Sequence, residues 1–352
     1  MNLAAGAKAA WPAGLALGLS LLGGLAAEAL GLPAGWLVGG SAVVTVAALL
    51  GVPLAMPAPL RDAGFILVGL SMGSSVARDT LALIGQWPIT MAALAVSLAL
   101  IVGATGWVLT TRLGFDKRTA LLASTPGHSS FIQGLALSGL GDARQIAVVQ
   151  SIRILTLVIA VPLFVAVSAP SALVPVADPA PMDWLTLAWL APVCALAGWI
   201  AIRLKVPAGF VIGAMAASTA ARLGGLSEGA APWFVVIPGF LVIAALIGSR
   251  FAGVTGDLLR RSLAGGLVAT VLAVAISGSA AWVASLFVDF SFSEIWIAIA
   301  PGGLESMAGM GMALGYDPAF VVTHHAARLF MLALAMPMLM VAMRPPPEPR
   351  GR

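Results

Sequence analysis

Long apolar runs separated by short polar breaks dominate this chain. A helix needs about 20 apolar residues to cross the hydrocarbon core of a bilayer, and each run has close to that length. Six runs lie at about 12–30, 33–51, 62–78, 87–111, 119–140 and 145–168. Six more lie at about 184–202, 207–225, 234–252, 262–288, 294–314 and 318–342. The pattern predicts an all-α polytopic membrane protein. The first run follows Lys8 as in a signal peptide, but its length and its mid-chain counterpart favour a spanning helix.

The second six runs repeat the first six at an offset of 174–175 residues. LPAGWLVGG (32–40) matches VPAGFVIGA (206–214), and AGFILVGLSMGS (63–74) matches PGFLVIAALIGS (238–249). The polar, glycine-rich segment 125–153 likewise aligns without a gap with 300–328. Between the copies lies a proline-rich stretch without Lys or Arg. We therefore expect a first membrane repeat at 1–167, an external linker at 168–183, a second membrane repeat at 184–343 and a cytoplasmic tail at 344–352.

Composition agrees with a membrane location. Apolar residues make up 60% of the chain and charged residues only 9%, against about 25% in soluble domains. Cys194 is the single cysteine, which excludes a disulfide framework and a thiolate metal site. The net charge of +4 is not gathered in a basic stripe, so we expect no nucleic-acid partner.

The distribution of Lys and Arg discriminates between two topologies. If all twelve runs cross, nine basic residues lie inside and seven outside. If the fifth run of each half enters and leaves on one side, fourteen lie inside and two outside. We therefore predict two inverted repeats, each with five spanning helices and one broken or re-entrant segment, and both termini in the cytoplasm. Four tryptophans near span ends are expected to anchor at the membrane interface: Trp11, Trp87, Trp184 and Trp233.

Each re-entrant candidate contains a helix break. Pro126-Gly127 interrupts the first, and Pro301-Gly302-Gly303 the second. Non-helical backbone at membrane depth is tolerated only inside protein or beside a water-filled cavity. The start of a half-helix is an anion site, and matching breaks in two halves point to a transporter's central site. Polar residues follow the breaks: Thr125, His128, Ser129, Ser130 and Gln133 in the first, and Glu305 and Ser306 in the second. They could bind substrate or ion, or only cap the broken helix ends.

Arg153 and Arg328 follow the breaks at matching positions. Each lies about 13–15 Å into its helix at ~1.5 Å per residue, near the bilayer midplane. An arginine there costs several kcal/mol unless it is paired or faces water. Gln150 and His325 lie one turn earlier on the same helix faces. The arginines could bind an anionic solute, tie to backbone carbonyls of the broken segments, or do both.

Three acids accompany the arginines. Glu305 could pair with Arg153 or Arg328, or titrate and carry a proton. Asp142 and Asp317 precede the arginine helices and are expected to cap their N-termini. Pro318 directly after Asp317 supports this, because proline favours the first helical position.

Enzyme and cofactor motifs are missing from the sequence. The histidines are His128, His324 and His325, with no Cys or carboxylate cluster beside them, so we expect no metal. There is no Ser-His-Asp spacing, phosphate loop or dinucleotide fingerprint. We expect no enzyme activity and no cofactor.

The segment PGGLESMAGMGMALGYDPAFVVTHHAARLFMLALAMP, its weaker first copy and the PAG-x3-G block of each half resemble the AbrB family of bacterial membrane proteins. The first copy departs from the pattern, since it has His128 and no acid where Glu305 stands. The family is similar to secondary transporters with two inverted five-helix repeats and crossed broken helices, such as sodium–proton antiporters and bile-acid symporters. The resemblance implies a multi-pass protein of the bacterial inner membrane.

These observations favour a secondary transporter of a small anionic or carboxylate-bearing solute, coupled to H⁺ or Na⁺. An AbrB-type membrane regulator or sensor that acts on gene expression indirectly is the alternative, and a membrane enzyme a third. The lipid bilayer is an expected partner. The small-residue face GLALGLSLLGG (14–24) could pack a homodimer or pack within the chain.

Overall fold

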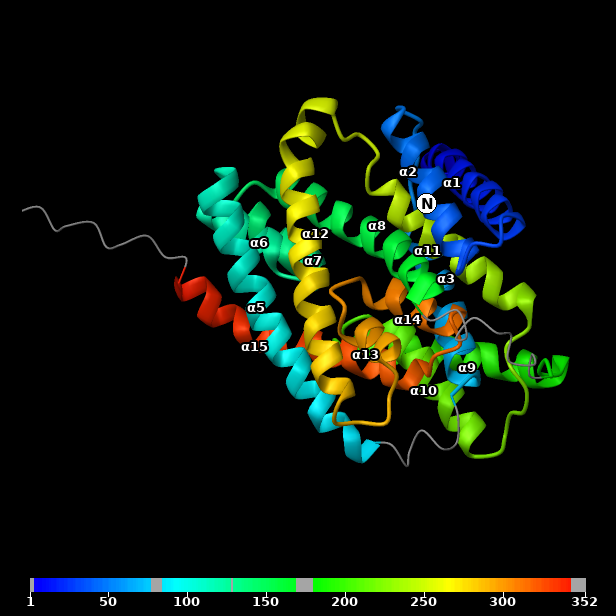
Figure 1. Ribbon diagram of the computed structural model, residues 1–352. Coiled ribbons are helices and arrows are strands. Elements are labelled where there is room, and N and C mark those ends of the chain that lie inside the picture. The colour runs from blue at the N-terminus through cyan, green and yellow to red at the C-terminus, as the bar shows by residue number, and fades with distance from the viewer. Residues whose placement is uncertain (1–2, 77–83, 128, 169–179, 343–352) are drawn as a thin grey trace, which may run out of the picture.

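The computed structural model is built from helices (Figure 1). It describes residues 3–76, 84–127, 129–168 and 180–342, so His128, most of the linker and the tail at 344–352 lie outside the described residues. The first half contains α1 (Leu3–Ala29), α2 (Gly35–Leu49), α3 (Ala58–Ser74), η1 (Ile84–Gln86), α5 (Trp87–Leu113), α6 (Lys117–Ser124), α7 (Ser129–Leu137) and α8 (Ala143–Ser168). The second contains α9 (Trp184–Arg203), α10 (Gly209–Leu223), α11 (Trp233–Ser249), α12 (Gly256–Ser285), α13 (Phe292–Ile299), α14 (Leu304–Ala313) and α15 (Pro318–Ala342).

Six described helices are long and apolar enough to cross a membrane: α1, α5, α8, α9, α12 and α15. This is the composition of a polytopic membrane protein. The helices α2, α3, α10 and α11 have only 15–17 residues, and all but α3 are shorter than their apolar runs. The runs overestimate α2 and α10 because each helix begins only after a left-handed alanine, Ala34 or Ala208.

The fifth run of each half is not one helix. It is divided into α6 and α7 in the first half, and into α13 and α14 in the second. The two ends of each segment lie together. The Asp142 backbone N–H donates to Thr119 Oγ1 at 3.0 Å, and the Asp317 N–H donates to Glu294 Oε1 at 3.4 Å. Each broken segment therefore returns to the place where it began.

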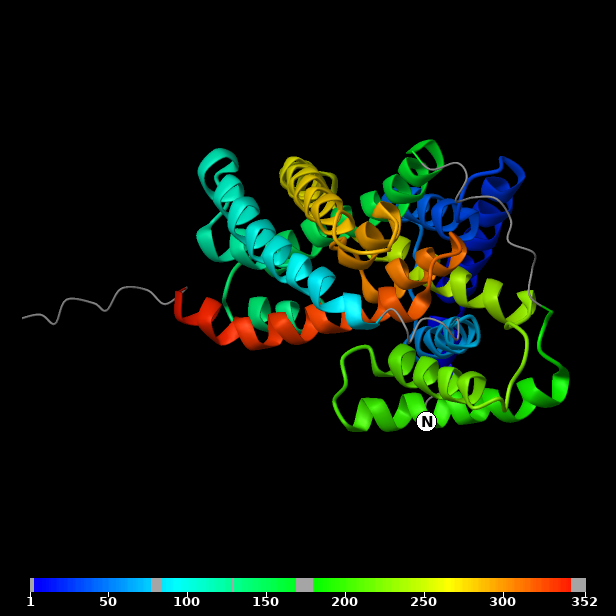
Figure 2. The same cartoon turned by 60° about the horizontal axis from the view of Figure 1, so that its bottom comes forward.

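The helices form two groups (Figures 1 and 2). We call α1–α3 with α9–α11 the panel, and α5–α8 with α12–α15 the core group. Both views place α5, α12 and most of α15 on one side and α1, α2, α9 and α10 on the other. Each group contains equivalent helices from both halves, so neither half packs as a unit by itself.

Equivalent helices of the two halves run antiparallel where they meet. A Cβ on Gly64 of α3 would touch Val242 of α11, and a Cβ on Gly239 of α11 would touch Val68 of α3. In the core group, the Gln86 side chain exchanges two hydrogen bonds with Asp289, which joins the start of α5 to the end of α12. The close approaches of α3 and α11 are reciprocal between the two helices.

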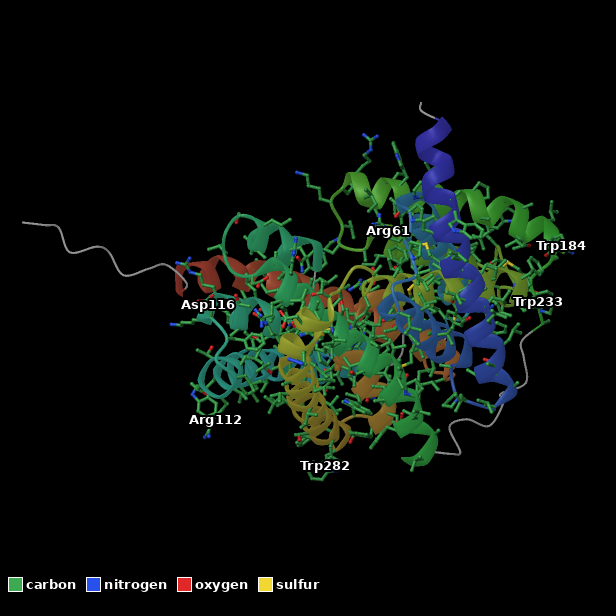
Figure 3. The ribbon with its side chains drawn as sticks, turned by 90° about the horizontal axis from the view of Figure 1, so that it is seen from above. Arg61, Arg112, Asp116, Trp184, Trp233 and Trp282 are labelled. Carbon is green, nitrogen blue, oxygen red and sulfur yellow. The ribbon has the colours of Figure 1, made fainter. Side chains whose placement is uncertain are left out.

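Three of the four tryptophans expected at the membrane interface are exposed. Trp11, Trp184 and Trp233 have exposed fractions of 69–73%, and Figure 3 shows Trp184 and Trp233 at the rim of the molecule. Trp87 is only partly exposed, and its place at the membrane interface stays a prediction. Its ring packs against Phe320 and His324, and its Nε1 is buried, because the start of α5 lies against α15.

Candidate substrate cavity

A cavity of about 470 Å³ lies between the panel and the core group. The panel lines it with the start of α3, the α9–α10 turn and the end of α11. The core group lines it with both helix breaks and with the middle of α8 and α15. The charged lining residues are Arg61, Asp62, Arg153, Arg250, Glu305 and Arg328, and the lining glycines of the breaks are Gly127, Gly302 and Gly303.

The second break is held by Arg328. Its Nη1 donates to the carbonyl of Ala300 at 2.8 Å, and its Nη2 donates to that of Gly302 at 2.6 Å. These carbonyls flank Pro301, where α13 ends and the helical ladder is interrupted. One turn earlier, His325 Nε2 donates to the carbonyl of Ile297 at 3.0 Å. Side chains of α15 therefore replace the hydrogen bonds that the break removes.

The first break repeats this arrangement, with fewer bonds among the residues that the structure describes there. Arg153 Nη1 donates to the carbonyl of Ala123 at 3.3 Å, and Gln150 Nε2 donates to that of Leu122 at 3.2 Å. The tie to backbone carbonyls, one of the two roles considered for the arginines, is thus present in both halves. Arg153 and Arg328 also line the cavity, so the tie places both charged groups beside it.

Both arginines are buried, and no carboxylate of the described residues is in contact with either of them. Their exposed fractions are 3% and 1%, and the Nε atoms of both lack a hydrogen-bond partner. The ion pairs within 4.0 Å among the described residues are Arg61–Asp62 and Arg261–Asp257. Close pairing of Glu305 with Arg153 or Arg328, one of the two roles considered for this acid, is therefore absent among the described residues. Glu305 attracts Arg328 and Arg250 from a longer distance, and Arg153 repels Arg328.

Glu305 lies half-buried in the first turn of α14, at the cavity wall. Gly303 precedes the helix with an extended backbone, and the Ser306 hydroxyl donates to its carbonyl at 3.1 Å. An acid in the first turn interacts favourably with the positive end of the helix dipole. Glu305 is thus an acidic side chain among the arginines that line the cavity.

Two other predicted residues, Thr125 and Gln133, are not among the residues that line the cavity. The Thr125 hydroxyl donates to the carbonyl of Leu121 at 2.8 Å, so it is used within α6. Gln133 is half-buried on α7. Ser129 and Ser130 begin α7, but their side chains lie outside the described residues, as does His128.

Asp142 and Asp317 occupy the capping positions of α8 and α15. Asp142 accepts from the N–H groups of Arg144 and Gln145, both at 3.0 Å. Asp317 accepts from those of Ala319 at 2.7 Å and Phe320 at 3.4 Å. These bonds fix the start of the two arginine helices.

The histidines of α15 are enclosed by protein. His324 bonds the Phe320 carbonyl and the Thr90 hydroxyl, at 2.8 and 2.7 Å. His325 is fully buried behind the second break. Among the described residues, no group of three His, Cys, Asp or Glu side chains could hold a metal ion.

Sequence reasoning missed the panel side of the cavity. In the sequence, Arg61 and Arg250 entered only the count of basic residues on the cytoplasmic side, and Asp62 was not considered. Arg61 donates twice to Asp62 Oδ1, from Nε at 2.9 Å and Nη2 at 2.8 Å. The sequence could have pointed to the α9–α10 turn as part of the site, because its residues Ala208 and Gly209 belong to the duplicated PAG block.

The duplicated PAG block has an unusual backbone. Ala34 and Ala208 have φ values of 52° and 51°, in the left-handed region that alanine avoids at a cost of roughly 1–2 kcal/mol. Such residues concentrate at functional sites, where surrounding structure enforces them. Ala208 lines the cavity, so the α9–α10 turn is part of the candidate site.

The fold and the cavity define an all-helical, polytopic membrane-type protein with two broken helices beside one charged cavity. The chain belongs to the AbrB family, as its resemblance indicated: the family model "Transition state regulatory protein AbrB" matches residues 36–344. It is 26% identical over 333 residues to "Putative regulator AbrB" of Escherichia coli, covering 91% of this chain and 92% of that protein. It is also 24% identical over 355 residues to "Uncharacterized protein YhjN" of Bacillus subtilis, covering 91% of this chain and 90% of that protein.

Proposed function

We propose that this chain is a secondary transporter that moves a small anionic, carboxylate-bearing solute by alternating access. The observation that carries the proposal is the cavity between the panel and the core group, where both helix breaks meet four arginines. Broken helices at a central site are the usual binding architecture of secondary transporters. In this scheme the core group moves against the panel, and Arg153 and Arg328 give the site its preference for anions.

We further propose that the two halves are inverted in the inner membrane of a bacterium, with both termini in the cytoplasm. The antiparallel course of α3 and α11, and of α5 and α12, supports this relation. So does the return of each broken segment to its starting place. With this topology, the basic residues Arg61 and Arg250 lie at the cytoplasmic side, and the cavity opens there.

Coupling to H⁺ or Na⁺ belongs to the same proposal, and the carbonyl groups at the breaks favour H⁺. Unwound backbone carbonyls commonly coordinate the coupling Na⁺ in transporters of this kind. Here Gln150, Arg153, His325 and Arg328 already bind five such carbonyls. Glu305 lines the cavity and is the titratable group best placed to carry the proton.

Counterflow of radiolabelled anions into proteoliposomes tests the transport role. We expect saturable uptake by the native chain and loss of uptake in the Arg153→Ala plus Arg328→Ala double variant. Because each arginine also supports a helix break, folding is checked by size-exclusion profile and thermal unfolding. Unchanged uptake by a well-folded double variant would refute the roles given to the two arginines.

The names of the matched family and of the E. coli relative favour a second candidate, a membrane regulator or sensor. It would influence gene expression through a partner protein bound at the short cytoplasmic loops. Affinity purification from membranes, combined with the flux assay, discriminates between the two. A stoichiometric partner together with absence of flux would favour the regulator.

A further inference from the structure

The charge balance of the cavity narrows the class of solute. Four arginines and two acids line it, so with both acids ionised the wall carries an excess of two positive charges. Arginine stays protonated under all relevant conditions, so this excess cannot be removed by release of protons from the guanidinium groups. The neighbouring carbonyls satisfy N–H groups of Arg153 and Arg328 but do not neutralise their charges.

Two of the positive charges, those of Arg153 and Arg328, lie where burial makes a charge energetically unfavourable. Arg153 and Arg328 are almost completely buried, repel each other and have an Nε without a partner. Burying a charge is costly unless it is paired. Asp62 is engaged by Arg61, which leaves Glu305 as the only cavity acid, among the described lining residues, whose charge acts on Arg250 and Arg328.

We infer that the cavity binds a small solute carrying two negative charges. A dianion neutralises the wall, whereas a monoanion leaves one positive charge uncompensated at membrane depth. The arginines also differ in exposure, since Arg153 and Arg328 are buried while Arg61 is partly exposed and Arg250 is exposed. A dicarboxylate and a compact inorganic dianion such as sulfate both carry the two negative charges, and they differ in size.

This inference rests on the proposed site but not on transport itself, so binding is measured separately from flux. Succinate and succinamate have nearly the same shape and differ by one charge. Thermal stabilisation of the full-length chain in detergent gives the affinity for each probe, with sulfate as a third. We expect succinate to bind at least tenfold more tightly than succinamate, and a comparison with sulfate tells a dicarboxylate from a compact dianion.

Arg250→Gln reduces the excess to one positive charge. The Arg250 side chain is exposed in the cavity, so the substitution is expected to leave the fold intact. It should lower the preference for succinate over succinamate roughly tenfold, because one charge–charge interaction is lost. Arg112→Gln removes an exposed arginine outside the cavity and should leave the preference unchanged.

The results of these binding and flux measurements distinguish the dianion inference from the transport proposal. Equal binding of succinate and succinamate, or a preference that Arg250→Gln does not alter, would overturn the dianion inference even if anions are transported. Preferential binding of the dianion without any flux would support the inference and refute the transport proposal. Absence of binding by all three probes would also overturn the inference.

Discussion

Arg153 and Arg328 occupy equivalent positions but make unequal contacts. Arg328 spans the second break with two short bonds, while Arg153 makes one longer bond among the described residues at the first. A buried carbonyl that loses its partner costs about 1–3 kcal/mol. The second break therefore depends more strongly on its arginine.

Lysine substitutions test this difference. Arg328→Lys keeps the charge but cannot reproduce the planar fork that reaches two carbonyls. We expect it to lower the free energy of unfolding by about 2 kcal/mol and the rate of counterflow by at least about tenfold. Arg153→Lys should have a smaller effect on both, because only one carbonyl loses its bond. Thermal unfolding and counterflow measure the effects, and equal losses in the two variants would contradict the asymmetry.

At the scale of elements, the broken segments are too short to cross a bilayer in halves. The half-helices have 8–10 residues, or roughly 12–15 Å at 1.5 Å per residue. The ties from Thr119 to Asp142 and from Glu294 to Asp317 bring both ends of each segment together. The segment tips, with the Pro-Gly breaks, are therefore the parts that reach the cavity.

Cysteine accessibility tests the re-entrant topology. The buried Cys194 is first replaced by alanine, and single cysteines are placed at the exposed positions Arg144 and Ala313. We expect an impermeant thiol reagent to label Arg144→Cys only from the cytoplasmic side and Ala313→Cys only from the outer side. Arg112→Cys and Leu226→Cys serve as controls for the two sides. The reverse pattern would overturn the topology.

The α3–α11 crossing depends on glycine. A Cβ on Gly64 would lie 2.4 Å from Val242 Cγ1, and one on Gly239 would lie 2.7 Å from Val68 Cγ2. Gly64→Ala and Gly239→Ala should each destabilise the panel by about 1–3 kcal/mol through overpacking. Thermal unfolding measures this. Gly103→Ala is the matched control, since nothing lies within 4 Å of its Cβ position and it should be neutral or slightly stabilising.

On the scale of the whole molecule, the panel and the core group meet around a cavity whose positive charges are arginine side chains of the protein. Arginine and neighbouring side chains donate hydrogen bonds to the backbone carbonyls at the helix breaks, which could otherwise coordinate Na⁺. The wall keeps one cavity acid, Glu305, that is not in an ion pair among the described residues. This distribution of charge favours proton coupling over sodium coupling.

Flux measurements test that preference. Replacing Na⁺ by choline should leave anion uptake unchanged, whereas an inward proton gradient should stimulate it. Glu305→Gln should remove the stimulation while binding of the anion is retained, because the carboxyl that carries the proton is gone. A pH-sensitive dye inside the liposomes reports proton movement. Sodium-dependent uptake, or unaltered proton stimulation in Glu305→Gln, would contradict the assignment.

The sequence by itself determined the helical segments, the duplication and the positions of the breaks. Apolar run length and Pro-Gly pairs act locally, so Pro126-Gly127 and Pro301-Gly302 interrupt the helices where the pattern predicts. The pairs Gln150/His325 and Arg153/Arg328 were visible because the duplication aligns them.

Only the tertiary structure decided what those residues meet. Arg61 and Arg250 come from separate panel helices and converge on the cavity through packing between distant parts of the chain. The choice of backbone carbonyls over Glu305 as the close partner of the buried arginines, and the packing of Trp87 against α15, have the same origin. Hydropathy and spacing describe one helix at a time, whereas a cavity is defined by the relative placement of many helices.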